Sequence, residues 1–248
     1  LTENGNIDKW KNIEKYRKQN KKPYFLWKLE FAEVFQEKVG FDIVIGNPPY
    51  IKEAENKEAF NGIRNNKEYY QGKMDIWYYF SCIGLDLLKD KGTLAIIAQN
   101  NWITSDGASK LRNKIIMECK IIEFIDFFDY KVFNTAGIQT MIKIIEKNNE
   151  ENRKYNLKYA RLLNDKISLI ELMEFLNKKR RKDFEYFICS MEQEILIDKV
   201  ISFVDVKENN VLEKIKSNSN FFLKNEEIFS GIDIMQDFLS KDGKEILG

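Results

Sequence analysis

The sequence predicts an α/β fold, a partial doubly wound, Rossmann-like sheet with a mostly helical carboxyl-terminal extension. Apolar side chains recur at helical spacing over 76–87 and 107–118. Strands that alternate with such helices are typical of doubly wound sheets. Four short apolar, β-branched runs are predicted as these strands: 41–45, 93–98, 121–127 and 138–145.

The first predicted strand leads into an unusually stiff turn. Residues 41–45 read as a strand buried on both faces, as in the interior of a parallel sheet. Gly46 ends the strand, and Asn47-Pro48-Pro49-Tyr50 follows. Proline fixes φ and restricts the residue before it, so this turn is rigid before any ligand binds. Because open α/β sheets place active sites at the carboxyl ends of strands, we expect the active site here.

The turn offers a specific set of chemical groups. Asn47 has a side-chain carbonyl, and Pro48 has a backbone carbonyl with no N–H beside it. Two acceptors that converge suit a group with two N–H donors, such as an exocyclic amino group. The ring of Tyr50 suits stacking on a planar base. The other interpretation of these residues is a structural Pro-Pro turn after a core strand.

Composition excludes several classes of function. The chain has 40 basic and 39 acidic residues, so no global positive field marks a nucleic-acid binder, and any such footprint must be local. It has no histidine, which excludes catalysis through an imidazole and histidine-ligated zinc, and no metal site is predicted. No apolar run approaches the ~18 residues of a membrane span, so no membrane partner is expected.

Three cysteines, odd in number and widely spaced, favour a reducing cytoplasm without a disulfide framework. No signal peptide opens the chain. Its first residue is Leu1 rather than methionine, so we expect an internal piece of a longer protein.

Three regions are expected. Residues 1–40 form a lead-in, with a helix that includes Trp10, Ile13 and Tyr16 and an aromatic segment that packs beside the first strand. Residues 41–147 carry the site, and the polar stretch 52–73 is predicted as a loop that folds over it. The helix that begins at Ile76 is predicted to end at Lys91-Gly92.

Residues 148–248 are predicted as a linker followed by helices. One helix is expected over 162–175 and another after Ser190, which with Gln193 has the spacing of a capping box. The run Lys178-Lys179-Arg180-Arg181-Lys182 is a candidate for DNA phosphate contacts. Cations at the carboxyl end of a helix are also ordinary dipole and solvation chemistry, and both interpretations stay open.

The Asn47-Pro48-Pro49-Tyr50 stretch resembles the motif of the gamma class of adenine-N6 DNA methyltransferases, in particular the methyltransferase part of combined type II restriction–modification enzymes. Successive family segments resemble this sequence in the same order over about 23–147, and Glu227 to Phe238 resembles the start of a target-recognition domain. The matching segments are Asp75-Ile76-Trp77-Tyr78-Tyr79-Phe80, the strand that begins Lys91-Gly92-Thr93, Leu111-Arg112 and Val132-Phe133-Asn134-Thr135-Ala136-Gly137.

The resemblance implies methyl transfer from S-adenosylmethionine to an adenine flipped out of double-stranded DNA. It implies that Phe133 stacks on the base opposite Tyr50, and that Asp75 lies near the donor. The family holds the donor in a glycine-rich turn upstream of the motif, and no two glycines here are separated by a single residue. We therefore expect the main donor site to be absent from the chain, the fragment alone to be inactive, and its exposed sheet edge to allow self-association.

Two other functions are considered. A non-catalytic DNA-binding or specificity module would keep the basic run but would not need Asn47. A nuclease would use Asp126, Asp129 and Lys131, which loosely resemble a metal-binding arrangement, although such spacings are common by chance.

Overall fold

The computed structural model describes residues 15, 18, 25–133, 138–150, 154–192, 201, 203, 210, 211, 214, 215 and 217–219. The chain divides into two compact units, 1–206 and 207–248, and every strand described below belongs to the first. The predicted helix around Trp10 and the segment from Glu227 to Phe238 lie outside the described residues.

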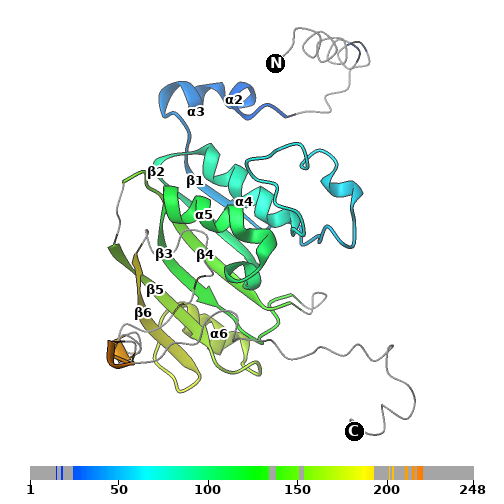
Figure 1. Cartoon of the computed structure of the whole chain (residues 1–248). Helices are drawn as coiled ribbons and strands as arrows, with labels where there is room; N and C mark the ends of the chain where they lie inside the picture. The colour runs from blue at the N-terminus through cyan, green and yellow to red at the C-terminus, as the bar shows by residue number, and fades with distance from the viewer. Residues whose placement is uncertain are drawn as a thin grey trace, which may run out of the picture. The chain divides into compact units, whose positions relative to one another are not determined.

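One six-stranded mixed sheet organises the first unit (Figure 1). Its strands are β1 (Phe41–Gly46), β2 (Leu88–Gln99), β3 (Cys119–Asp126), β4 (Thr140–Lys147), β5 (Lys154–Leu162) and β6 (Phe184–Glu192). The α-helices are α2 (Trp27–Glu30), α3 (Ala32–Glu37), α4 (Ile76–Leu87), α5 (Ser109–Glu118) and α6 (Leu169–Leu176). Short 3₁₀ turns lie at Glu58–Phe60, Asn101–Ile103 and Asp106–Ala108. No helix among the described residues has the length and apolar character needed to cross a membrane.

The strand order is β1-β2-β4-β3-β5-β6. β1 and β2 are parallel, as are β3 and β5, while β4 runs antiparallel to both of its neighbours and β6 antiparallel to β5. The α/β fold, the four predicted strands and the two predicted helices between them are confirmed. The reversed direction of β4 makes the sheet mixed.

Alternating side chains divide the core between the two faces of the sheet. On one face α4 and α5 lie side by side (Figure 1) over residues such as Leu94, Ile121 and Ile145. On the other face α6 packs through Phe175 against Leu162 and Phe184. α6 is short and lies at the β5–β6 end, so it leaves the β1 end of this face open.

The prediction that the first strand is buried on both faces is wrong. Ile43 is 61% exposed and Ile45 is 79% exposed, whereas Val44, on the opposite face, packs against the core under α4. The physical reason is that Ile43 and Ile45 point to the face on which α6 packs only at the β5–β6 end, so among the described helices none covers them. Among the described residues β1 pairs only with β2, so it is also an edge strand. The aromatic lead-in does lie beside its first residue, since the rings of Phe31 and Phe35 meet Phe41 edge-on.

Helix α4 ends at Leu87, earlier than predicted, and β2 begins at once. Gly92 is therefore not a helix cap. A Cβ there would lie 2.8 Å from the backbone oxygen of Phe41, so glycine allows β1 and β2 to approach each other at their start.

The extension is less helical than predicted over its described part. β5 and β6 form an antiparallel pair from Lys154 to Glu192, and α6 between them begins at Leu169 rather than near 162. Ser190 lies within β6, so it caps no helix. The capping box is instead formed by Ser168 and Glu171 at the start of α6.

Candidate functional site

The Asn47-Pro48-Pro49-Tyr50 turn leaves the carboxyl end of β1. Gly46, the last strand residue, pairs with Ile96 of β2. Pro48 is buried, Tyr50 is half-buried, and Asn47 is exposed. The turn therefore holds an anchored backbone and an accessible amide, and the Asn47 side chain does not point into packed interior.

The hydroxyl of Tyr50 fixes the orientation of the turn. It lies 2.9 Å from Asn47 Oδ1 and 3.0 Å from the backbone oxygen of Ile97 in β2, and it donates toward these two oxygens. Burial, followed by the negative charge of Asp75, raises the pKa of Tyr50 to about 12, so the hydroxyl keeps its proton at neutral pH. The Asn47 oxygen is thereby directed toward Tyr50, and a carbonyl oxygen keeps a second lone pair for a ligand.

Phe133 comes from a distant part of the sequence to lie beside Tyr50. The two ring centroids are 6.2 Å apart, and the ring planes are tilted by 53°. This is a direct ring contact, so a planar group that enters between the rings must first separate them. The two aromatic residues predicted to stack on a base are thus neighbours.

A cavity of about 430 Å³ lies close to the turn. One wall is the segment after Tyr50, which is held to the start of α4 by hydrogen bonds from Ile76 N to Ile51 O (2.9 Å) and from Glu53 N to Met74 O (2.9 Å). The opposite wall is the loop after β2. The lining residues are Lys52, Ala54, Lys73, Met74, Asp75, Tyr78, Gln99, Asn101 and Ser105, which do not include the turn itself.

Asp75 is the acidic residue of this cavity and is only 4% exposed. Its Oδ1 accepts a hydrogen bond from Trp77 N (3.4 Å) and so caps α4, while its Oδ2 has no hydrogen-bond partner among the described residues. Burial raises the pKa of Asp75, and the backbone N–H groups of Trp77 and Ile51 offset part of this rise.

Two buried basic side chains, Lys143 and Arg112, hold the loop after β2. Lys143 of β4 is 1% exposed, donates to the backbone oxygen of Gln99 (3.1 Å), and lies 4.4 Å from the ring centroid of Trp77. Burial lowers the pKa of Lys143 well below its usual value. Arg112 of α5 donates to the backbone oxygens of Trp102 (2.7 Å) and Ser105.

These two residues were not predicted as part of the site. Lys143 had a visible signal, because it is the single charged residue within the apolar strand Met141-Ile142-Lys143-Ile144-Ile145. Arg112 had none beyond its place in the Leu111-Arg112 segment, since a cation in a helix is ordinary.

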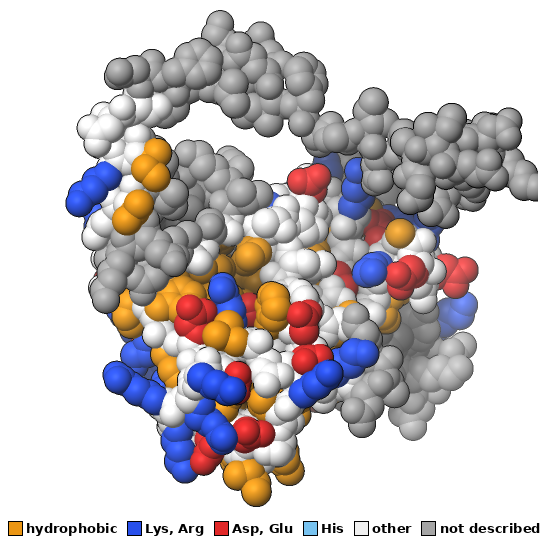
Figure 2. All heavy atoms as spheres, turned by 90° about the horizontal axis from the view of Figure 1, so that it is seen from below, with side chains coloured by type: hydrophobic (Ala, Val, Ile, Leu, Met, Phe, Trp, Pro, Cys, Tyr) orange, Lys and Arg blue, Asp and Glu red, His pale blue; other side chains and the backbone are white. Residues whose placement is uncertain are grey.

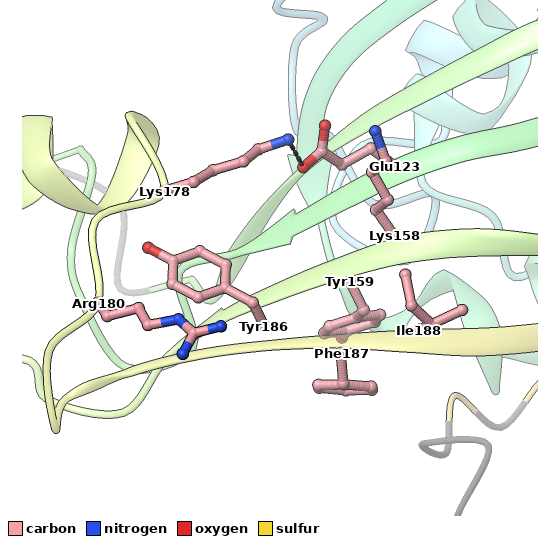
Figure 3. Close-up of a pocket in the computed structure, with 8 residues that line it drawn as sticks. All are labelled: Glu123, Lys158, Tyr159, Lys178, Arg180, Tyr186, Phe187 and Ile188. Carbon is pink, nitrogen blue, oxygen red and sulfur yellow. Dashed lines mark ion pairs between the residues drawn. The ribbon is translucent and has the colours of Figure 1, made fainter.

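The basic run lies between α6 and β6, beside a second hollow of about 310 Å³ (Figure 3). Lys178 points to Glu123 and forms an ion pair with it (2.8 Å). Lys179 pairs with Glu174, and Arg181 pairs with Glu171 and Glu174. Among the described residues, Arg180 and Lys182 make no ion pair.

Charge on this end of the molecule is mixed. Figure 2, seen from below relative to Figure 1, shows basic, acidic and hydrophobic side chains interspersed over the visible face. A broad basic surface is therefore not present on this view of the described residues.

The residues of the nuclease alternative serve structural purposes. Asp126 is buried, and its carboxylate accepts hydrogen bonds from Tyr159 Oη (2.9 Å) and Phe128 N (2.9 Å). Asp129 accepts a hydrogen bond from the Gln139 amide (2.7 Å). Within the described ranges no group of three acidic or cysteine side chains is arranged to hold a metal ion, and the three cysteines are buried.

Comparison with known proteins identifies relatives. Residues 2–133, more than half of the chain, match the family described as Eco57I restriction-modification methylase. The Escherichia coli protein named type II restriction enzyme and methyltransferase RM.Eco57I is 26% identical over 185 residues, which cover 72% of this chain and 17% of that protein. The type II methyltransferase M.BstVI of Geobacillus stearothermophilus is 25% identical over 162 residues, 64% of this chain and 28% of that protein. The chain thus spans less than a third of either relative.

Solved structures of similar fold include a DrdV–DNA complex, with a TM-score of 0.48 and 17% identity over 72% of this chain and 20% of that one. Another is the methyltransferase subunit of a type I restriction-modification system from Streptococcus thermophilus, with a TM-score of 0.44 and 20% identity over 74% of this chain and 39% of that one.

Proposed function

Because the chain belongs to the Eco57I restriction-modification methylase family, we propose that its Asn47-Pro48-Pro49-Tyr50 turn binds the amino group of a flipped adenine during methylation of double-stranded DNA at adenine N6. The observation that carries this proposal is the exposed Asn47 amide, whose oxygen is oriented by the hydroxyl of Tyr50. The ring of Tyr50 lies beside the ring of Phe133.

The turn acts on the amino group by accepting its hydrogens. The nitrogen is a poor nucleophile because its lone pair is delocalised into the purine ring. Hydrogen bonds to Asn47 Oδ1 and to the Pro48 carbonyl favour a pyramidal nitrogen whose lone pair is directed out of the ring plane. This is positioning and electrostatic stabilisation, and it requires no strong base.

The rings of Tyr50 and Phe133 offset the cost of extruding the base. Unstacking and unpairing a nucleotide costs a few kcal/mol, and stacking on an aromatic side chain returns ~1–3 kcal/mol per base. The base enters by separating the two rings, whose centroids are 6.2 Å apart without it.

S-adenosylmethionine would supply the methyl group as the donor of this family. The described residues do not fit a complete binding site for it. The sequence before β1 contains no glycine-rich turn of the kind that holds the donor in this family. Asp75, the residue expected near the donor, lines the cavity between the loops after β1 and β2. We therefore propose that this chain binds and orients the acceptor base.

Substitution of Asn47 tests the proposal. In a protein that joins this chain to a complete donor site, Asn47→Ala is expected to reduce methyl transfer to DNA at least about 100-fold, because a transition-state hydrogen-bond acceptor is lost. DNA affinity is expected to stay within about twofold, because phosphate contacts supply most of it. Incorporation of labelled methyl groups and a DNA-binding titration measure the two quantities. Asn65→Ala, at an exposed asparagine, is the control. An Asn47→Ala protein with normal methylation contradicts the proposal. DNA binding without any methyl transfer, equal in the parent protein and in Asn47→Ala, favours the DNA-binding module.

We further propose that the basic run contacts DNA phosphates through Arg180 and Lys182. Support comes from the ion pairs that occupy the other three cations of the run, which leave these two side chains exposed and available.

The open edge of β1 supports a proposal of self-association. β1 pairs with β2 on one side, and Ile43 and Ile45 extend the open edge with exposed apolar side chains. Unpaired backbone groups next to apolar side chains are a template for a strand of another molecule, here a second copy of this chain.

A further inference from the structure

Phe128, just after β3, has a backbone conformation that disfavours its side chain. Its φ is 48°, in the left-handed region that glycine usually occupies and a bulky residue rarely does. It is the first central residue of a turn closed by a hydrogen bond from Tyr130 N to Phe127 O (2.9 Å). Burial compensates for this strain only in part, because the residue is 43% exposed.

A buried carboxylate holds the turn in place. Asp126 is 5% exposed and accepts hydrogen bonds from Phe128 N at Oδ1 (2.9 Å) and from Tyr159 Oη at Oδ2 (2.9 Å). On either side of Phe128, Phe127 is buried and Tyr130 packs against the core under α6. The backbone is thus fixed to the sheet, and the Phe128 ring is presented to solvent with little freedom left to lose on binding.

The turn that carries Phe128 lies on the same edge of the sheet as the Asn47-Pro48-Pro49-Tyr50 turn. β1 and β2 are parallel, and β4 is antiparallel to both β2 and β3, so β1 and β3 end at the same edge. β2 and β4 lie between them, and three strand spacings of ~4.8 Å place the two strand ends about 14 Å apart. Phe133, five residues after Phe128, connects the two turns through its ring contact with Tyr50.

The residues around Phe128 suit a nucleic acid. Among the described residues from 118 to 162, Phe128 is the one large hydrophobic residue that is exposed. Lys131 is also exposed and forms no ion pair within the described part of the chain, while Asp129 is occupied by the amide of Gln139 (2.7 Å). A flat ring close to an available cation matches a base and its phosphate.

We propose that Phe128 is a wedge that stacks on a DNA base and unstacks one base step within about four steps of the flipped adenine. The inference rests on the proposed function for the position of the DNA, since about 14 Å corresponds to about four nucleotides at 3.4 Å each. Apolar wedges between base steps deform a duplex without reading its sequence. The wedge stabilises the opened DNA, while Tyr50 and Phe133 hold the extruded base.

Photo-cross-linking tests the stack directly. The chain is irradiated with random-sequence duplex DNA that contains 5-iodouracil in place of thymine, a base that couples to aromatic side chains stacked on it. Mass spectrometry of the cross-linked peptides is expected to identify Phe128. Phe128→Tyr is expected to keep the cross-link, and Phe80→Ala, at a 48% exposed position on α4, is the control that leaves it unchanged.

Two variants separate binding from stability. Phe128→Gly and Phe128→Asn both suit a positive φ and remove the ring. Each is expected to weaken duplex binding about tenfold with an unchanged slope against salt, because no phosphate contact is lost. Phe128→Gly is also expected to melt at a temperature no lower than that of the parent protein, because the backbone strain is relieved.

Three results would each overturn the proposal: no cross-link at Phe128, unaltered DNA affinity in both variants, or a loss of stability in Phe128→Gly that matches its loss of affinity. Asn47→Ala distinguishes this inference from the proposed function, because it is expected to retain the Phe128 cross-link. If Asn47→Ala keeps normal methyl transfer while Phe128 still cross-links, the proposed function fails and the contact of Phe128 with DNA stands.

Discussion

The two edges of the sheet differ in chemistry although they belong to one sheet. At one edge, β6 is tied to β5 by cross-strand ion pairs between Lys154 and Glu192 (3.4 Å) and between Arg161 and Glu185 (3.6 Å). At the other edge, β1 carries one charged residue, Asp42, and its exposed side chains Ile43 and Ile45 are apolar.

The charged side chains at the β6 edge are typical of a strand that faces solvent. The apolar side chains of β1 are typical of a strand inside a sheet. Charges on an edge strand oppose pairing with other strands, whereas an exposed β-branched edge favours it. β6 therefore has the charge pattern of a solvent-facing edge strand, whereas the exposed apolar side chains of β1 support the proposed self-association. Five substitutions, in four experiments, break or sharpen this comparison.

The largest effect is expected where β1 joins the sheet. A Cβ at Gly40 would lie 2.6 Å from the backbone nitrogen of Lys89 and 2.8 Å from the backbone oxygen of Leu87, so Gly40→Ala forces the start of β1 away from β2. We expect a loss of about 2–3 kcal/mol in the free energy of unfolding, as for other overpacked sites. Urea denaturation measures it. Gly62→Ala, where the added Cβ meets no atom within 4 Å, is the control, and equal stability of the two variants would show that β1 tolerates displacement.

The centre of the sheet provides a reference that leaves both edges unchanged. Lys143→Met removes a buried amine at similar volume, and we expect it to stabilise the fold by about 1–2 kcal/mol at neutral pH. Because burial lowers the pKa of Lys143 in the folded state, the unfolded chain binds more protons below its reference pKa of 10.5. Wild-type stability therefore rises with pH, and the advantage of Lys143→Met shrinks as pH approaches 10.5. Thermal unfolding across pH measures this, and a constant difference would contradict it.

Ile45→Lys tests the proposed role of the β1 edge. A charge on this strand is expected to raise the dissociation constant for self-association about tenfold or more, while stability changes by less than about 0.5 kcal/mol because the residue is 79% exposed. Sedimentation velocity measures association. Ile188→Lys, at a 42% exposed position on β6, is the matched substitution and is expected to have no effect. An equal response of both variants would remove the distinction between the edges.

The smallest effect is expected beside β6, at the basic run. Arg180→Ala and Lys182→Ala are each expected to weaken DNA binding only a few-fold and to reduce the slope of affinity against salt by about one. Lys179→Ala, whose ammonium is paired with Glu174, is the comparison variant. DNA titrations at several salt concentrations measure the slopes, and slopes that do not change would place the phosphate contacts elsewhere.

Local pattern was sufficient to predict the strand β1, the helix α4 and the proline turn that follows β1. β-branched residues, helical spacing and two prolines act within a few residues of one another, so they are visible in the sequence. The alternation Tyr155-Asn156-Leu157-Lys158-Tyr159 is also a strand pattern, and the prediction of a mostly helical extension overlooked it.

What the sequence did not indicate depends on distant partners. Exposure of Ile43 and Ile45 depends on which helix packs on their face of the sheet, and α6, which packs there at the β5–β6 end, is distant from β1 in the sequence. The reversed direction of β4 likewise arises from pairing with β2 and β3. The support of the Gln99 loop by Lys143 and Arg112 joins β4, α5 and the end of β2, so no local motif announces it.

Tyr50 contributes two separable groups to the turn, an aromatic ring and a hydroxyl. The ring provides a flat surface. The hydroxyl, through its hydrogen bond to Asn47 Oδ1, sets the orientation of the Asn47 amide. Tyr50→Phe would keep the ring but remove the hydrogen bond to Asn47. The Asn47 amide could then flip and direct its NH2 group, in place of its oxygen, toward the amino group of the proposed base. In the proposed function, one phenolic proton thus separates attraction from repulsion between the Asn47 amide and the amino group of the base.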